Sequence, residues 1–402
     1  MGNNILFLSI FIIQMILYIY LTTTSIYIFT FSISALFPYK CKLKFLSDKK
    51  RNFAIIIPCY HEDDVIFEVI QSALNHNYLT FDIVVIADGF RQESIEKLKK
   101  LPIILFDENF DVSTKTRAIN FALRQLPDNK YDAVVILDAD NIMENDFLSK
   151  INESFNQGFL VIQGHRVAKN TNTNFAVLDA ISEEINNQIF RKGHRVLGLS
   201  SALIGSAMAF DYVFFKNLMN DIEVVGGFDK ELEMRLMRDN YKIEYLHDAY
   251  VFDEKVQNIQ VFTKQRRRWL SAQFHYFGIH FIPALKALFI NQNIDYFNKA
   301  YQYVQLPRIL LTGLLFIITC ISIPLNPTHL TIGWSVSLLL AVLSLLFSVP
   351  RKFYNQLTLK AVFYLPVGFL FMALSLLKMK GANKKFIHTK HTYNAFQIKQ
   401  KK

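Results

Sequence analysis

The stretch Ala-Val-Val-Ile-Leu-Asp-Ala-Asp-Asn, from Ala133 to Asn141, decides how the rest of the chain is interpreted. Its first five residues form a short apolar run rich in β-branched side chains, which is typical of a buried β-strand. Asp138 and Asp140 follow at positions i and i+2, so a turn at the strand end can point both carboxylates towards one hard cation. Oxygen ligands of this kind suit Mg²⁺ or Mn²⁺. An ordinary turn is the alternative, because Asp-x-Asp is also a common turn sequence.

Three earlier apolar runs have the same form and also lead into carboxylates. They are Phe53–Ile57, Ile83–Ala87 and Ile103–Phe106. Glu62 follows the first run, Asp88 the second, and an acidic pair the third. Helix-like segments at 64–74 and 114–126 alternate with the runs, which predicts an α/β domain with a mostly parallel sheet. Ligands of such sheets bind at the carboxyl ends of the strands, so an anionic ligand there would need a cation beside these acids.

The composition favours a membrane protein. Of 402 residues, 51% are hydrophobic and 19% are charged, against roughly 25% charged in a typical soluble domain. Disorder is excluded because so much apolar surface must be buried, and an ordinary cytosolic enzyme is not favoured. The 44 basic and 34 acidic residues give a net charge of +10, which fits an anionic membrane, an anionic substrate or nucleic acid. Cys41, Cys59 and Cys320 are too scattered for a disulfide framework, and we expect free thiols.

Residues 1–38 are expected to form a membrane anchor. No charged side chain occurs from Ile5 to Phe37, which is long enough for one tilted helix. A cleaved signal peptide is not favoured, because the basic start and the small-residue cleavage site are missing. The basic cluster from Lys40 to Arg51 marks the cytoplasmic side. We therefore expect the domain at 50–270 to lie in the cytoplasm, at the inner (plasma) membrane of the cell.

More apolar segments follow this domain. The candidate spans within 303–378 are Val304–Leu325, Leu330–Val349 and Leu359–Leu377. Segment 271–292 is apolar but is interrupted by His280, Pro283 and Lys286, which suits a helix lying in the membrane interface. Four spans in this multi-pass arrangement would place the basic tail, 379–402, on the opposite side from the basic cluster. The charge rule favours the same side, so the sequence leaves this conflict open.

An ordered set of short motifs gives the chain a family resemblance. The set is Pro58-x-x-x-Glu62, Ala87-Asp88-Gly89, Lys115 with Ala118-Ile119-Asn120, Asp138-Ala139-Asp140, Gly226-Gly227-Phe228-Asp229 and Gln265-Arg266-Arg267-Arg268-Trp269. Over about residues 50–275 the chain resembles the membrane-bound family 2 glycosyltransferases, which include cellulose, hyaluronan and poly-N-acetylglucosamine synthases. The resemblance implies a GT-A (nucleotide-diphospho-sugar transferase) domain of the α/β class with flanking transmembrane helices. It also implies a nucleotide-sugar donor, a divalent metal (Mg²⁺ or Mn²⁺) and inversion at the anomeric carbon.

The resemblance implies a donor site made from the strand ends. Glu62 and Asp88 would contact the nucleoside, and Lys115 would approach a donor phosphate. Asp138 and Asp140 would hold the metal and the diphosphate, with Asp140 the more direct ligand.

The resemblance also implies residues that lie over the donor and the acceptor. Gln265, Arg268 and Trp269 would cover the donor and the acceptor's terminal sugar. Arg268 would supply a fixed cationic fork, and Trp269 a flat apolar face. Gly205 and Ser206 resemble the acceptor-site loop of the family. Arg266 and Arg267 could instead bind anionic lipid head groups.

The expected catalytic base is a carboxylate at the start of a helix. Inversion in one step needs a group that removes the proton of the acceptor hydroxyl. The family supplies it as the Asp of a Thr-Glu-Asp motif before a helix that resembles Lys230–Leu236 here. Counting back from that helix places Asp229 at the base position, although Gly227 and Phe228 replace the Thr and the Glu. Asp229 could instead be a helix N-cap, and Glu231 is the second candidate for the base.

These features predict an integral-membrane inverting glycosyltransferase that transfers a sugar, expected to come from a UDP-sugar, to a growing polysaccharide or a glycolipid. Gln-x-x-Arg-Trp favours a processive synthase, and the few spans then indicate a narrow channel, or one shared with a second copy or an accessory membrane subunit. A non-processive enzyme that adds one sugar to a lipid-linked acceptor is the alternative. A transporter or scaffold with a degenerate transferase domain is a third alternative, against which the intact motifs argue. Positive charge lies at membrane flanks and in the tail, so we expect membrane lipids and no nucleic acid as partners.

Overall fold

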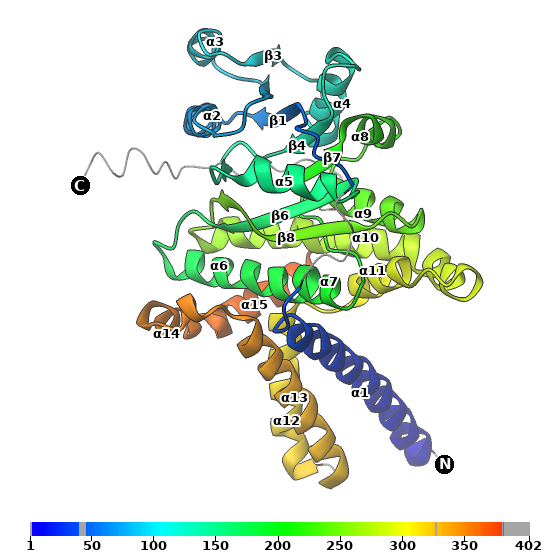
Figure 1. The fold of residues 1–402 in the computed structure, drawn as a ribbon. Coiled ribbons are helices and arrows are strands. Elements are labelled where there is room, and N and C mark those ends of the chain that lie inside the picture. The colour runs from blue at the N-terminus through cyan, green and yellow to red at the C-terminus, as the bar shows by residue number, and fades with distance from the viewer. Residues whose placement is uncertain (1, 40–45, 326–327, 380, 382–402) are drawn as a thin grey trace.

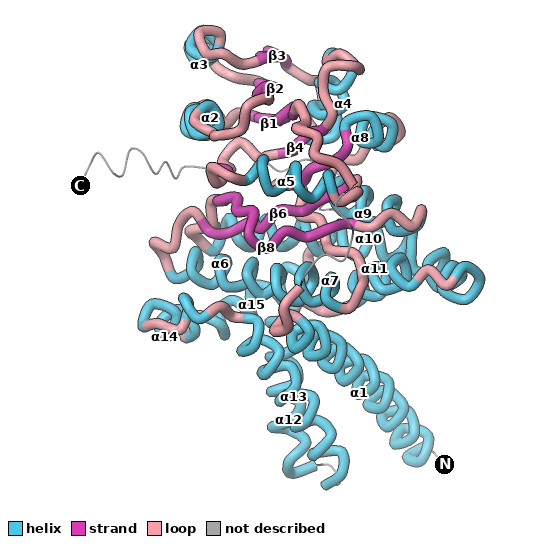
Figure 2. The backbone as a smooth tube through the Cα atoms, viewed as in Figure 1, coloured by secondary structure: helices cyan, strands magenta, loops and turns pink. Residues whose placement is uncertain are grey.

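One mixed sheet of eight strands forms the centre of the soluble domain (Figure 2). The computed structural model describes residues 2–39, 46–325, 328–379 and 381. The strands are β1 (Phe53–Tyr60), β2 (Phe81–Asp88), β3 (Ile104–Glu108), β4 (Ala133–Ile136), β5 (Ile142–Met143), β6 (Val161–Ala168), β7 (Met208–Asp211) and β8 (Ile243–Asp253). Their order across the sheet is β3-β2-β1-β4-β7-β6-β8-β5.

The four strands predicted from the sequence are confirmed as β1 to β4. β1 pairs in parallel with β2 and β4, and β2 pairs in parallel with β3. The register sets Asp88 opposite both Tyr60 and Glu108, so the carboxyl ends of these strands meet at one edge. Alternate residues of β1 enter two different apolar clusters, Ile56 on one face and Ile55 on the other. Burial on both faces explains the continuous apolar runs.

The other half of the sheet differs from the mostly parallel sheet that we predicted. β7 is antiparallel to both of its neighbours, β4 and β6, and β5 is antiparallel to β8. The chain enters β7 through the loop 200–207, which lies at the edge that carries the carboxylates, where Ser206 Oγ accepts a hydrogen bond from the Asp138 amide at 3.1 Å. Because β7 starts at that edge, it has to run against β4.

Helices cover both faces of the sheet and extend below it (Figure 1). Those of the soluble domain are α2 (Ile66–Leu74), α3 (Gln92–Leu98), α4 (Lys115–Gln125), α5 (Phe147–Asn156), α6 (Asn174–Asn186), the π-helix η1 (Asn187–Gly193), α7 (His194–Val196), α8 (Tyr212–Met219) and α9 (Phe228–Arg238). The others are α1 (Gly2–Ser34), α10 (Ile259–Asn291), α11 (Ile294–Val304), α12 (Arg308–Leu325), α13 (Thr328–Ser348), the 3₁₀-helix η2 (Arg351–Phe353), α14 (Gln356–Val362) and α15 (Leu365–Leu377). The two predicted helices, 64–74 and 114–126, are confirmed as α2 and α4.

Among the residues that the structure describes, three helices are long and apolar enough to cross a membrane, by length and composition. They are Leu8–Ser34 within α1, and all of α12 and α13. In Figure 1 these helices project together away from the soluble domain. Their outer faces are apolar: Ile13 is 65% exposed. Small hydroxyl side chains lie between them, and Ser32 Oγ of α1 is 2.9 Å from Ser348 Oγ of α13. Apolar residues outside and small polar residues inside are typical of helices that pack in lipid.

Helix α1 also packs tightly against the soluble domain. Gly193 ends the π-helix η1, and a Cβ atom at this position would lie 2.2 Å from the carbonyl oxygen of Phe31. The ring of His194 stacks on Phe31 with centroids 3.7 Å apart. The hydroxyl of Tyr27 donates to Asn298 Oδ1 at 2.7 Å. The end of α1 is therefore fixed on three elements of the domain.

The helices near the membrane surface differ in shape from the predicted segments. The expected interfacial helix, 271–292, is the second part of α10, a single 33-residue helix that also carries Gln265–Trp269. The expected span Leu359–Leu377 is a pair of helices, α14 and α15, bent by 49°. α14 packs on α6, and α15 packs on α10 and α12. α15 is about 20 Å long, whereas the hydrocarbon core of a bilayer is about 30 Å thick.

Candidate active site

A single cavity of about 1120 Å³ brings the predicted site residues together at the carboxyl edge of the sheet. The predicted residues that line it are Glu62, Asp88, Lys115, Asp138, Asp140, Gly205, Asp229, Gln265, Arg268 and Trp269. They come from the ends of β1, β2 and β4, from the loop 200–207, and from the first turns of α4, α9 and α10. Residues that are far apart in the chain therefore face one space.

Three carboxylates converge in this cavity. Asp138, Asp140 and Asp253 each offer one oxygen atom, and these oxygen atoms all lie within 4.8 Å of one another. Asp140 is 1% exposed. Its two oxygens accept hydrogen bonds from Asn141 Nδ2 at 3.0 Å and from the Glu254 amide at 2.9 Å. Fixed oxygen ligands in this number fit a hard divalent cation of the Mg²⁺ or Mn²⁺ type.

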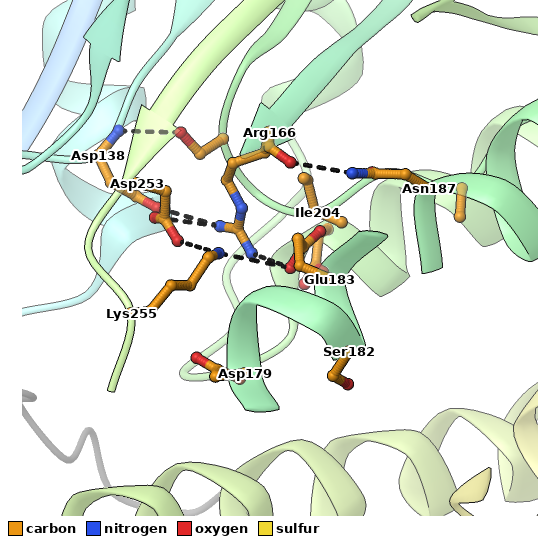
Figure 3. A network of polar contacts seen from close by, with 12 residues as sticks. Asp138, Arg166, Asp179, Ser182, Glu183, Asn187, Ile204, Asp253 and Lys255 are labelled. Atoms are coloured by element: carbon orange, nitrogen blue, oxygen red, sulfur yellow. Dashed lines mark hydrogen bonds and ion pairs between the residues drawn. The ribbon is translucent and has the colours of Figure 1, made fainter. Parts of the chain in front are cut away.

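Buried cations surround the carboxylates and hold them in place (Figure 3). Lys255 Nζ lies 2.7 Å from Asp253, and the guanidinium of Arg166 lies 3.6 Å from Asp253 and 4.0 Å from Asp138. Arg166 also reaches Glu183 of α6 at 3.1 Å. Burial raises the pKa of Asp253, but Arg166 and Lys255 outweigh this effect and lower it. Asp253 and Arg166 therefore stay charged at neutral pH.

The sequence reasoning missed Asp253 and its partners. A usable signal was present, because Asp253 is the last residue of β8 and follows the same pattern of a strand ending in a carboxylate. β8 escaped notice because exposed and buried residues are mixed along it, so it lacks the continuous apolar run of β1 to β4. Arg166 and Glu183 carry no such signal, since their pairing depends on the packing of α6 against β6.

Lys115 links the carboxylate cluster to Asp229. Its ammonium group donates to Asp138 and, at 2.7 Å, to the carbonyl oxygen of Gly205. Gly205 has φ of +80°, and a Cβ atom there would lie 3.8 Å from the Cβ of Asp229. Asp229 is the second residue of α9, whose N-cap is Gly227. The alternative that Asp229 is the N-cap is therefore wrong, and its side chain faces the cavity.

The predicted acceptor residue Ser206 has a structural position. It is fully buried, and it is not among the described residues that line the cavity. Its hydroxyl donates to Asn141 Oδ1 and accepts from the Asp138 amide. Ser206 thus fixes the turn that presents Asp138 and Asp140, and a direct contact with an acceptor stays a prediction.

Glu231, the second candidate for the base, does not line the cavity and contacts a different set of residues. Its carboxylate accepts from Arg235 Nε at 2.7 Å, and His280 Nε2 lies 3.9 Å away. The contacts with His280 and Arg235 outweigh burial and lower the pKa of Glu231 to about 2. Such a carboxylate is a poor proton acceptor at neutral pH.

Glu231→Gln is expected to leave sugar transfer nearly unchanged, without the loss of about 10²–10⁴-fold that removal of a general base causes. The free energy of unfolding is expected to fall by about 1.5–3 kcal/mol, because hydrogen bonds to charged groups are lost. Transfer rates and thermal melting in detergent would measure both effects. A large loss of transfer with an unchanged melting temperature would return Glu231 to the catalytic role.

The predicted covering residues lie on the first turns of α10. Arg268 is mostly buried, which lowers its pKa, while the nearby carboxylates of Asp229 and Asp138 raise it. Its guanidinium therefore lies close to both parts of the site. Arg266 pairs with Asp179 of α6 and stacks on the Trp269 ring, 4.5 Å from its centroid. Arg266 is thus turned into the protein and not towards lipid head groups, whereas Arg267 is exposed.

The remaining sequence expectations concern the donor pocket and the cysteines. Glu62 and Asp88 are 7% and 3% exposed, and both line the cavity at the ends of β1 and β2. Cys59 and Cys320 are free thiols, as expected. Cys41 lies outside the described residues.

A mixed α/β sheet with an acidic cluster at its carboxyl edge and long apolar helices at both ends is the architecture of a membrane-associated GT-A glycosyltransferase. Residues 50–272 match the family described as "Glycosyltransferase like family 2", and the chain belongs to this family. The family resemblance and the GT-A fold predicted from the sequence are therefore confirmed, and the protein is a family 2 glycosyltransferase.

The similar proteins include polysaccharide synthases and a mannosyltransferase. Poly-beta-1,6-N-acetyl-D-glucosamine synthase of Staphylococcus aureus strain MSSA476 is 23% identical over 234 residues, which are 55% of this chain and 54% of the relative. The enzyme of strain COL is 22% identical over the same length. The chain thus spans about half the length of these relatives. The structure of the mannosyltransferase PcManGT from Pyrobaculum calidifontis, in complex with GDP-Man and Mn²⁺, covers 92% of this chain and 99% of its own with a TM-score of 0.56 and 14% identity. That likeness concerns the fold.

Proposed function

We propose that the protein is an inverting glycosyltransferase of the membrane surface, which uses a nucleotide-sugar donor and a divalent metal. The observation that carries this proposal is one cavity that holds both the three converging carboxylates and Asp229. A relative that makes poly-N-acetylglucosamine and a fold neighbour that binds GDP-Man and Mn²⁺ support it. The proposed cytoplasmic position of the site follows from the basic cluster after α1.

The positions of the side chains give each a task in one-step transfer. Asp138, Asp140 and Asp253 would hold Mg²⁺ or Mn²⁺, which supplies positive charge beside the donor diphosphate when it is bound. Lys115 and Arg268 add fixed positive charge on the same side, which stabilises the leaving nucleoside diphosphate. Asp229 accepts the proton of the acceptor hydroxyl as that oxygen bonds to the anomeric carbon.

A donor panel tests this function. Purified full-length protein is incubated in detergent with UDP-, GDP- and other nucleotide sugars and Mn²⁺, starting with UDP-N-acetylglucosamine because of the similar synthases. We expect release of nucleoside diphosphate from one donor, expected to be a UDP-sugar, and only when metal is present. The length of the product then distinguishes a processive synthase from an enzyme that adds one sugar. Absence of release from every donor would contradict the proposal.

We further propose three membrane crossings, by α1, α12 and α13. The bent pair α14–α15 packs along the soluble domain and α10, and in Figure 1 it lies across the base of that domain. With three crossings, Lys378 returns to the side of the soluble domain. This arrangement removes the conflict with the charge rule, because the basic cluster and the tail then share one side.

The expected result of a topology test is protection of the C-terminus. A single cysteine at Lys378, in a chain whose native cysteines are replaced by Ser, should react with a membrane-impermeant maleimide only after cells are opened. A cysteine at Thr328, the exposed first residue of α13, serves as the opposite control and should react in intact cells. Labelling of the Lys378 position in intact cells would indicate four crossings.

A further inference from the structure

The cavity of the active site continues into the membrane part of the protein. Below the carboxylates it runs between α12, α13 and α15, where it is lined by residues that include Phe316, Ile317, Val342, Leu345, Phe369 and Met372. Along α12 its lining extends from Arg308 to Ile317, which is about 14 Å of helix, or roughly half of the hydrocarbon thickness. The cavity therefore connects the active site to a region that lies at the depth of the lipid tails.

This lower part of the cavity is apolar. Beyond Arg308, Thr312 is the only residue with a polar side chain that α12, α13 and α15 contribute to the lining, in the part of the chain that the structure describes. The Thr312 hydroxyl already donates to the Arg308 carbonyl at 2.8 Å. A glycan here would bury hydroxyl groups without partners, which costs free energy. A hydrocarbon chain has no such cost and gains from the burial.

Two side chains with unpartnered donors, Arg308 and Gln305, lie where the polar and apolar parts of the cavity meet. Arg308 Nη2 donates to the Ser182 carbonyl at 3.2 Å, but Arg308 Nη1 is buried without a hydrogen-bond partner. Arg308 forms no ion pair with any residue that the structure describes. Gln305, which is 5% exposed, also has a buried Nε2 group without a partner. Both side chains line the cavity. Unpaired donors around a buried positive charge favour an anionic ligand.

Arg308 is linked to the carboxylate cluster through α6. Ser182, which contacts Arg308, is followed by Glu183, and Glu183 pairs with Arg166. Figure 3 shows Ser182 and Glu183 on one helix, with Arg166 between Glu183 and Asp253. A ligand at Arg308 would therefore approach the donor site from the membrane side, with Asp229 in the same cavity.

We infer that the acceptor is a lipid-linked sugar: its hydrocarbon tail lies between α12, α13 and α15, its phosphate binds Arg308 and Gln305, and its sugar faces Asp229. The inference rests on the proposed function and specifies the acceptor class. In the reaction, a hydroxyl oxygen of the lipid-linked sugar bonds to the anomeric carbon of the donor. The bond from that carbon to the phosphate oxygen breaks, the nucleoside diphosphate leaves with the electron pair, and the hydroxyl proton passes to Asp229.

Binding of farnesyl phosphate to the full-length protein in detergent, without metal, tests the lipid site by native mass spectrometry. We expect Arg308→Leu, and Val342→Trp, which fills the lower cavity, each to weaken binding by about tenfold or more. Val336→Trp is the matched control, because it is the same change on the same helix at a residue that is 48% exposed and does not line this cavity. Asp140→Asn should also keep wild-type lipid binding, because it changes only the donor site. Thermal melting confirms that each variant is folded.

The outcomes separate a lipid site from its alternatives. Farnesol that binds as tightly as farnesyl phosphate would overturn the inference. Inorganic phosphate that competes as strongly as farnesyl phosphate would also overturn it, in favour of a free-phosphate site. Unchanged binding in both Arg308→Leu and Val342→Trp would overturn it too, as would elongation of a lipid-linked oligosaccharide by Val342→Trp at the wild-type rate. Release of nucleoside diphosphate from the donor by water is measured in parallel. If no donor releases nucleoside diphosphate, the proposed function is contradicted, whatever the result of the lipid-binding experiment.

Discussion

Asp229→Asn should lower the rate of sugar transfer by about 10²–10⁴-fold, the usual contribution of a general base. The amide cannot accept the proton of the acceptor hydroxyl, yet it has nearly the same size as the carboxylate. Asp229 lies beside Gly205, whose carbonyl oxygen accepts from Lys115, and close to Arg268. The base therefore adjoins the residues proposed to hold the diphosphate, but it is not one of the converging carboxylates.

The measurement compares transfer rates with donor affinity. Donor binding, followed by isothermal titration calorimetry with Mn²⁺, should change little in Asp229→Asn, because the substitution removes a step of the chemistry. Glu231→Gln is the matched control, since Glu231 lies two residues further along α9 and pairs with Arg235. Transfer at the wild-type rate in Asp229→Asn would exclude this residue as the base.

Asp140→Asn is expected to lower sugar transfer by about 10²–10³-fold, because charge stabilisation at the diphosphate is lost. Asp140 is buried, and its oxygens are fixed by Asn141 and the Glu254 amide. The substitution removes one negative charge from a cluster that contains Arg166, Lys115 and Lys255. Cation affinity should therefore fall together with the rate, and more metal should be needed for half-maximal activity.

Titration of activity with Mn²⁺ measures this second effect, and removal of the metal with EDTA should reproduce the loss in the unchanged protein. Asp146→Asn is a matched control, because Asp146 lies outside the cavity and pairs with Lys150 on the surface. Equal activity of Asp140→Asn and the unchanged protein would exclude Asp140 as a ligand of the metal.

The parts of the fold that could be predicted from the sequence are those encoded locally. β1, β2 and β4 are buried on both faces, so each is a continuous apolar run followed at once by functional residues. The direction of β7 could not be predicted, because it depends on where the loop 200–207 crosses the sheet. Asp253 was missed for a similar reason, since β8 has a mixed pattern and reaches the cluster only through its pairing with β6.

The site residues on helices were predicted from motif order, and their neighbours were not. Counting along the chain placed Asp229 and Glu231 within one turn of each other, and only the packing shows that one faces the cavity and the other Arg235 and His280. The sequence near Arg308 shows a charge at the end of an apolar segment. It does not show that Arg308 has no ionic partner among the described residues, because that depends on the position of α6.

The close fit between Phe31 and Gly193 has a practical consequence for anyone who wants the catalytic part in water-soluble form. Cutting the chain before the basic cluster would strip the aromatic surface around His194 of its cover and leave Asn298 without Tyr27. Such a fragment should aggregate, because α1 packs against the domain as part of its structure and does more than attach it to the membrane. An unrelated anchor of equal length would hold the fragment at a bilayer without restoring the contacts of Phe31 and Tyr27.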